Sequence, residues 1–290
     1  MLRHHRVRSG SHEEFHRISR EDIWPLFHRI GARVVGQWKV LDAAPAASRD
    51  ADDVYRLVRY ASVEHWRATR FQRRLSGNGP AFERDRQALL ARSKLEVESS
   101  RAYFLEGSLA PGGPYFMPGL SERYELIESG RLPAVTETDI AVRLDLAQPG
   151  DELAELRFQR VQKGSFPELV AATQQSIWPW EEKLGARPIG QWKVIYPEEP
   201  AEPPLPVESP DFDEIVTMTR YASRRHYQAM AADDAVYLGG NGPDWQSWRA
   251  APERHRKLTI STSVQIVQGY LYAGPPIYFP GLPERYRRVR

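Results

Sequence analysis

The sequence repeats itself, because short motifs from its first half recur in the same order in its second half. The recurring motifs include tryptophan, glycine and proline, which chance rarely matches in order. They are Ile23-Trp24-Pro25 with Ile177-Trp178-Pro179, Gly36-Gln37-Trp38-Lys39-Val40 with Gly190-Gln191-Trp192-Lys193-Val194, Arg59-Tyr60-Ala61-Ser62 with Arg220-Tyr221-Ala222-Ser223, Gly77-Asn78-Gly79-Pro80 with Gly240-Asn241-Gly242-Pro243, and Pro118-Gly119-Leu120 with Pro280-Gly281-Leu282. The period is far longer than the roughly 20–50 residues of a solenoid repeat. We therefore predict two diverged copies of one domain, residues 1–125 and 151–290, joined by a linker of residues 126–150.

Composition limits the possible functions. A chain of 290 residues with 41% hydrophobic residues can form two domains of ordinary size. No run approaches the roughly 18 apolar residues of a membrane helix, and the N-terminus lacks the apolar core of a signal peptide, so we expect a cytoplasmic protein without membrane contact. Cysteine is absent, which excludes disulfides and thiolate catalysis, and we expect no metal site. A formal net charge of +2 gives no general reason to expect nucleic acid as a partner.

The second copy shows the order of predicted elements most clearly. Residues 155–161 alternate between polar and apolar, which predicts a half-buried strand, and the apolar stripe that begins at Phe166 predicts a helix. Pro179 must kink or restart that helix, because proline cannot donate a main-chain hydrogen bond. Two strands are expected at 190–196 and 215–221, followed by a helix that Ser223 caps and a last strand at about 258–270.

The first copy predicts the same series. It has a strand at 2–7, a helix that ends at residue 30, strands at 36–41 and 54–60, a helix capped by Ser62, and a strand near 94–104. The order βαββαβ is the ferredoxin-like motif. Outside the repeat, the acidic and proline-rich segment 197–213 is expected to be an exposed loop, and residues 138–146 alternate well enough for an extra edge strand.

These motifs together resemble the NIPSNAP domain. The resemblance rests on Glu155-Leu156-Arg157, the proline-interrupted helix, Gly-Ala-Arg followed by Gly-Gln-Trp, and Asp213-Glu214-Ile215-Val216 leading to Arg220-Tyr221; it is clearest in residues 151–245 and weaker in 1–80. It implies the dimeric α+β barrel superfamily, in which two ferredoxin-like sheets pack face to face and ligands bind inside. The fold class expected is therefore α+β, with two tandem modules forming one barrel. Relatives of this fold include cofactor-free monooxygenases, haem proteins and isomerases, so the fold does not fix the function.

Strand periodicity suggests which side chains line such a barrel. We expect Leu156, Phe158, Val216 and Met218 to face the helices, and the polar residues that alternate with them to face inward. The expected inward residues are Arg3, His5, Arg56, Tyr60, Glu96 and Glu98 in the first copy and Glu155, Arg157, Gln159, Thr217 and Tyr221 in the second. Ionisable groups buried in this way need partners or a ligand. The alternative is that this face of the sheet is simply solvated.

Aromatic and histidine residues supply further candidates. Trp38 and Trp192 are possible pocket walls, although packing under the helices or between the modules is the more common role of tryptophan. His65 and His226 occupy matching positions early in a helix, where neutral imidazole is favoured and can act as an acid, a base or a haem ligand. The alternative for both histidines is a surface or capping role.

The sequence contains none of the common nucleotide-binding, zinc-protease or serine-hydrolase motifs. We therefore expect a small-molecule-binding barrel that acts, without a nucleotide cofactor, on an aromatic or polyketide-like metabolite. This interpretation requires a cavity of roughly 300 Å³ or more. Two alternatives remain, a haem-binding barrel and a non-catalytic adaptor that uses the proline-rich loop 197–213. A homodimer of the whole chain is also possible.

Overall fold

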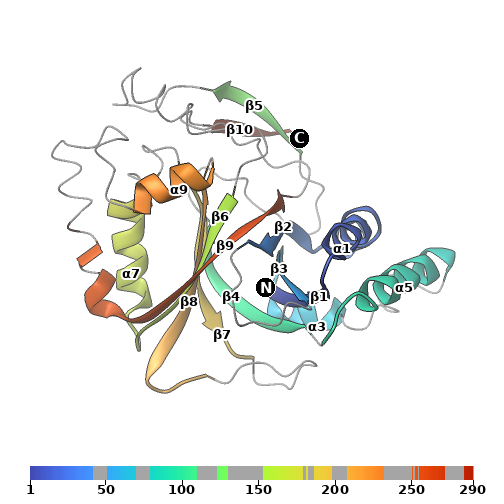
Figure 1. Cartoon of the computed structure of the whole chain (residues 1–290), viewed down its shortest axis with the longest axis horizontal. Helices are drawn as coiled ribbons and strands as arrows, with labels where there is room; N and C mark the ends of the chain where they lie inside the picture. Colours follow the sequence, from blue (N-terminus) through green and yellow to red (C-terminus); the bar gives the residue numbers. More distant parts are fainter. Residues whose placement is uncertain are drawn as a thin grey trace.

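Eight antiparallel strands form a closed barrel, and helices lie on its outer surface (Figure 1). The computed structural model describes residues 1–41, 51–69, 79–98, 100–109, 123–129, 153–178, 181, 186–197, 208–221, 223–231, 250, 252–253, 255–271 and 284–289. The strands of the barrel are β1 (Leu2–Arg8), β2 (Arg33–Val40), β3 (Ala51–Arg59), β4 (Arg101–Leu109), β6 (Leu153–Gln162), β7 (Arg187–Ile195), β8 (Phe212–Tyr221) and β9 (Thr259–Leu271). The predicted α+β barrel is thus confirmed.

The strand order shows how the two halves of the chain share this barrel. The order is β1-β3-β2-β9-β6-β8-β7-β4, and β4 pairs back with β1. Each half therefore contributes four neighbouring strands in the same relative order, β4-β1-β3-β2 and β9-β6-β8-β7. Two seams join the halves, β2 with β9 and β4 with β7. Closure pairs the strand edges that an open sheet would expose.

A glycine faces a tryptophan at each seam. Gly269 of β9 is opposite Trp38 of β2, and Gly107 of β4 is opposite Trp192 of β7. A Cβ atom added at Gly269 would lie 2.2 Å from the carbonyl oxygen of Gln37, and one at Gly107 would lie 2.3 Å from that of Gln191. The two strands of each seam therefore approach more closely than any larger residue would allow.

The first helical region of each half contains the same irregularity. In the first half, α1 (His12–Ile18), a π-helical turn (Ser19–Ile23) and α2 (Trp24–Arg29) follow one another; in the second half, α7 (Phe166–Ala172) is followed by a π-helical turn (Thr173–Ile177). The amide of Trp24 donates to the carbonyl of Ser19, five residues earlier, and the amide of Trp178 donates to that of Thr173. Pro25, the counterpart of Pro179 in the first half, lies directly after this turn at the second residue of α2, and the wider turn provides for a proline that cannot donate. Pro179 lies outside the described residues.

The remaining helices are α3 (Val63–Thr69), α5 (Pro80–Ser93) and α9 (Arg224–Ala231). The expected serine caps are present, since Ser62 Oγ accepts from the amide of His65 and Ser223 Oγ from that of His226, both at 3.1 Å. The strand expected near 94–104 begins only at residue 101, because residues 94–98 form a turn after α5 and pair with the barrel only through an isolated bridge between Glu96 and Val7. The helix α5 itself starts at a proline suited to a first helical position. None of the helices in the described part is long and apolar enough to span a membrane.

A separate two-stranded sheet pairs the ends of the two halves. It consists of β5 (Arg123–Ser129) and β10 (Glu284–Val289), which are antiparallel (Figure 1). The expected end of the first domain, at residue 125, therefore falls within a strand. The extra strand expected at 138–146 lies outside the described residues, and so do residues 198–207 of the proline-rich loop.

The interior of the barrel is apolar, so the expected assignment of the strand faces was wrong. Rings from non-neighbouring strands meet inside, with the centroids of Tyr55 and Phe158 5.9 Å apart. The buried residues of this core come from both halves: Leu2, Trp38, Val40, Tyr55, Leu57, Ala154, Leu156, Trp192, Val194, Val216, Met218 and Val267. Helix residues pack on the opposite face, where Phe15 contacts Val7 and Val54. Alternation shows which residues share a face of a strand, but not which face is enclosed. The more apolar face forms the barrel interior because the interior is closed off from water on every side.

Candidate functional site

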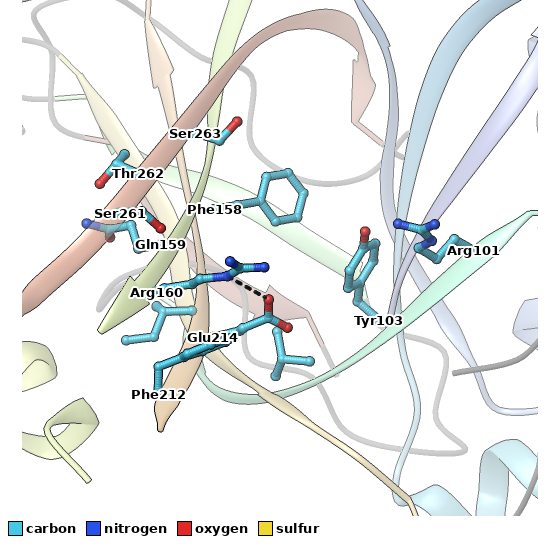
Figure 2. A pocket seen from close by; sticks show the side chains of 12 residues that line it. Arg101, Tyr103, Phe158, Gln159, Arg160, Phe212, Glu214, Ser261, Thr262 and Ser263 are labelled. Atoms are coloured by element: carbon cyan, nitrogen blue, oxygen red, sulfur yellow. Dashed lines mark ion pairs between the residues drawn. The ribbon is translucent and has the colours of Figure 1, made fainter. Parts of the chain in front are cut away.

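A cavity of about 610 Å³ opens at one end of the barrel (Figure 2). We call this region the barrel mouth. Its lining residues come from five strands of both halves: Arg101, Tyr103, Phe158, Gln159, Arg160, Val194, Phe212, Glu214, Ile215, Ser261, Thr262 and Ser263. The volume exceeds the roughly 300 Å³ that a small-molecule site requires.

Aromatic rings form the inner side of the barrel mouth. The Phe158 ring lies 5.7 Å from that of Tyr103 and 5.9 Å from that of Tyr55, both in tilted arrangements. Burial raises the pKa of Tyr55, so this phenol stays protonated at neutral pH. A hydrogen bond from Arg101 to Tyr103 raises the pKa of the arginine, which fixes a positive charge beside these rings. A planar apolar ligand therefore meets rings on one side and a cation at their edge.

Charged groups lie around a carboxylate on the other side of the barrel mouth. The Nε atom of Arg160 is 3.5 Å from Glu214, and Figure 2 shows this ion pair across the cavity from Tyr103 and Arg101. The hydroxyl of Tyr196 donates to the same carboxylate at 2.6 Å. Burial and the charge of Glu214 raise the pKa of Tyr196. The Arg160 guanidinium also lies 4.7 Å from the centre of the Phe212 ring, which restricts its orientation.

The first half supplies a matching ion pair beside the barrel mouth, with a histidine added. Arg6 lies 3.9 Å from Asp53, as Arg160 lies near Glu214 in the second half. His4 Nε2 is 2.7 Å from the same Asp53 carboxylate, and its ring stacks on Tyr55 at 4.7 Å. A carboxylate that orients an imidazole is an arrangement suited to general acid–base catalysis.

Several of the expected site residues do come together, but beneath the helices. Arg3 of β1 lies directly opposite Arg56 of the neighbouring strand β3, and the Nδ1 atom of His5 is 3.3 Å from Glu96. His5 meets the Phe15 ring of α1 edge-on at 5.2 Å, which places this group on the outer face of the barrel. Its members therefore do not line the barrel interior as we had expected.

The other expected residues are scattered. Arg157 forms an ion pair with Glu155 at 2.6 Å, and Tyr221 packs against Tyr227 of α9 at 5.1 Å. Gln159 contributes to the lining of the barrel mouth. Thr217 is paired with Arg157 on the neighbouring strand. The remaining four are Tyr60, which packs against His65 outside the barrel, Glu98, which forms an ion pair with Arg6 at 3.3 Å, and Trp38 and Trp192, which lie in the interior at the seams.

The helix histidines have structural contacts. His65 Nδ1 accepts from the amide of Ala61 at 3.1 Å, and Nε2 is 2.6 Å from the carbonyl oxygen of Ile30. With both ring nitrogens engaged, His65 does not fit the role of a haem ligand. His226 is 1% exposed and meets Tyr221 edge-on at 5.8 Å, on the outer face.

Sequence reasoning missed most of the barrel mouth because it selected the opposite face of each strand. The missed lining residues include Arg101, Tyr103, Phe158, Arg160 and Glu214. The missed residues beside the lining are His4, Arg6, Asp53, Tyr55 and Tyr196. The repeated Gly-Gln-Trp motif carried a usable signal. A large ring at a position where two halves must join indicates that the tryptophan face is the enclosed one.

Comparisons with known proteins identify the fold only. No family model matches the sequence, and no curated protein matches it. A proposed monooxygenase of Lactobacillus acidophilus NCFM has 9% identity, with 95% of this chain and 97% of that chain covered, at a TM-score of 0.50. An anthrone oxidase-like protein has 10% identity over 93% and 90% of the two chains, at a TM-score of 0.43. A NIPSNAP family protein of Agrobacterium tumefaciens str. C58 has 20% identity over 42% of this chain and 88% of that chain, at a TM-score of 0.28.

Proposed function

We propose that the barrel mouth binds a small, planar aromatic molecule with an acidic hydroxyl group, such as a polyketide-like phenol. The protein then acts on it by acid–base chemistry without a nucleotide cofactor. The observation that carries this proposal is the cavity of about 610 Å³, in which an aromatic wall is flanked by cations and a carboxylate. Such a combination provides shape, charge and a proton acceptor in one place.

Each group has a role in this scheme. Phe158 and Tyr103 contact the flat face of the ligand. Arg101 and Arg160, on opposite sides of the cavity, stabilise the negative charge that develops on its oxygen. Glu214 accepts the hydroxyl proton, and the hydroxyl of Tyr196 orients this carboxylate at 2.6 Å. His4, held by Asp53 at 2.7 Å, is a second group that can donate or accept a proton.

Binding is the first test. 1,8-Dihydroxyanthraquinone is a suitable probe, with binding measured by calorimetry. We expect Phe158→Ala to weaken binding at least about 10-fold, because it removes an aromatic contact and its buried area. Arg160→Gln should also weaken binding, whereas Arg86→Gln, an exposed arginine that pairs with Glu83 at 2.8 Å, should leave it unchanged. Equal affinity in all four proteins would refute the site.

Turnover is the second test. The reduced probe 1,8-dihydroxyanthrone is supplied with dioxygen in buffer without nucleotide, flavin or added metal. Loss of a proton to the protein makes the probe an anion that dioxygen can oxidise, so that the CH2 group of the anthrone becomes the quinone carbonyl, one oxygen atom enters the product and the other leaves as water. Dioxygen consumption and the absorbance of the quinone product are followed together. We expect Glu214→Gln to lower kcat while the affinity for the probe changes little, because the amide cannot accept the proton. Binding without turnover in the unaltered protein would reduce the proposal to a binding protein.

The fold itself leads to a related proposal. Residues 1–125 and 151–290 are diverged NIPSNAP-like, ferredoxin-like modules that became fused within one chain. The matched strand order, the matched π-helical turns and the matched seams support it. If the chain is divided between residues 126 and 150 and both pieces are coexpressed, we expect them to copurify as one complex. Pieces that purify separately as stable monomers would contradict it.

A further inference from the structure

A group of buried and half-buried basic side chains lies on the outer face of β1 and β3, away from the barrel mouth. It consists of three arginines, Arg3 of β1, Arg56 of β3 and Arg92 of α5, together with His5 of β1, and we call it the buried cation cluster. Burial and the neighbouring arginines hold the pKa of His5 well below its usual value, so this imidazole is neutral and the charge lies on the arginines. His5 is 0% exposed, Arg56 1% and Arg92 5%. Charged side chains are almost never buried to this extent without a partner of opposite charge.

The hydrogen-bonding capacity of Arg56, Arg92 and His5 is largely unused. Among the residues that the structure describes, Nε and Nη1 of Arg56 and the same atoms of Arg92 are buried without a hydrogen-bond partner, as are both ring nitrogens of His5. Glu96 is the nearby carboxylate, and its oxygen lies 3.3 Å from His5 Nδ1 without forming an aligned hydrogen bond. Within the described part of the chain, Glu96 is thus the carboxylate whose charge acts on both Arg56 and Arg92.

Aromatic rings hold these cations in place but do not neutralise them. The Arg56 guanidinium lies 5.0 Å from the centre of the Phe27 ring, and that of Arg92 lies 5.3 Å from the centre of the Phe15 ring. Such contacts are weaker than the penalty for burying an unpaired charge. The cations are therefore oriented and still require negative charge.

The second half of the chain shows a neutral version of the same region. Arg157, which matches Arg3, has its own carboxylate partner in Glu155 at 2.6 Å. The residue paired with Arg157 on the next strand is Thr217, where the first half has Arg56. The position of His5 is occupied by Gln159. The excess positive charge is thus confined to the first half and is not required by the fold.

We propose that the buried cation cluster binds a tetrahedral oxyanion of the phosphate or sulfate type, which accepts hydrogen bonds from Arg56, Arg92 and His5. Guanidinium groups are the preferred partners of such anions, because they donate two parallel hydrogen bonds. The pKa shifts of the two buried arginines agree with the geometry. Burial, followed by repulsion from Arg92 and Arg3, lowers the pKa of Arg56, and burial lowers the pKa of Arg92 to about 10. A bound anion would relieve both penalties.

The test is the thermal stability of the whole protein in phosphate or sulfate, compared with chloride at equal ionic strength. At about 100 times the dissociation constant, one anion should raise Tm by roughly 5 °C. The variants Arg56→Thr and His5→Gln carry the residues of the second half, which are compatible with the fold. We expect both to lose the phosphate effect, and Arg56→Thr to be at least as stable as the unaltered protein in chloride. Arg86→Gln, an exposed change on the helix that carries Arg92, should keep the full effect.

Equilibrium dialysis with labelled phosphate gives a readout that does not depend on variant folding, with about one phosphate expected per chain. Phenyl phosphate distinguishes the source of the anion. Binding of inorganic phosphate alone indicates a free ion, and equal binding of the ester through the same residues indicates the phosphate group of an organic ligand. The proposal is overturned if phosphate raises Tm no more than chloride does, or if Arg56→Thr and His5→Gln respond to phosphate as the unaltered protein does.

Discussion

The seam glycines provide the sharpest test of barrel closure, through the substitution Gly269→Ala. The added Cβ would lie 2.2 Å from the carbonyl oxygen of Gln37 and 2.7 Å from the Cα of Trp38, whereas ordinary contact begins at 3.4 Å. Both contacted atoms belong to the main chain, so a side-chain rotation cannot relieve the clash. The strands β2 and β9 would have to separate by about 1 Å along a seam that carries many hydrogen bonds.

The expected cost follows from these contacts. Overpacking in a closed structure typically costs 1–3 kcal/mol, and each seam hydrogen bond that lengthens loses up to about 1 kcal/mol. We therefore expect Gly269→Ala to lower the free energy of unfolding by about 3 kcal/mol. The assay is urea unfolding followed by tryptophan fluorescence, because Trp38 lies at this seam.

Two controls make the result specific. Gly107→Ala at the other seam should cost a similar amount, since its Cβ would lie 2.3 Å from the carbonyl oxygen of Gln191. Gly79→Ala, where no atom lies within 4 Å, should cost about 1 kcal/mol or less as a change at a helix cap. If Gly269→Ala unfolds within about 0.5 kcal/mol of the unaltered protein, the close approach of the seam strands does not hold the barrel together.

Three other predictions concern single residues. Burial lowers the pKa of His16 to about 4, so between pH 6.5 and 4 the unfolded chain binds a proton at this position and the folded protein does not. The free energy of unfolding should therefore fall by about 1–2 kcal/mol as the pH drops from 6.5 towards 4. In urea titrations, His16→Gln should reduce this dependence on pH. Asp213→Ala should cost about 2–3 kcal/mol in the same assay, because the carboxylate accepts from Gly164 at 2.9 Å and pairs with Lys193 at 3.0 Å. Ser19→Ala should cost about 1 kcal/mol, because the buried hydroxyl donates at 2.7 Å to a carbonyl one turn earlier; an unchanged midpoint would show that the π-helical turn does not depend on it.

Much of the fold could be predicted because period-two alternation and turn residues are local signals. The strands at Leu153–Gln162 and Phe212–Tyr221 contain the predicted segments and are each three residues longer in total. The helix Pro80–Ser93 was missed because charged residues occupy much of it and leave no clear apolar stripe. Its surest signal was Pro80 directly after a turn.

The candidate site could be predicted less well, for a geometric reason. His5 was expected inside the barrel, but its neighbour His4 faces the interior instead. Successive strand residues point to opposite faces, so choosing the wrong face exchanges every expected lining residue for its neighbour. Sequence alone does not reveal which face is enclosed when both carry apolar and polar side chains. The grouping of His5 with Arg56 was nevertheless correct, because it depends on strand pairing alone.

The two seams have a consequence for how the barrel responds to concentration. In a barrel built from two separate chains, closure is a bimolecular step, so dilution opens it and apparent stability depends on protein concentration. Here, β2 with β9 and β4 with β7 belong to one covalent chain, so their effective concentration is set by the connecting segment and not by expression level. The two halves are also present in equal amounts, and each half pairs with the other half of the same chain. A barrel mouth that has a histidine beside it in the first half only can therefore form in every molecule, even when the protein is scarce.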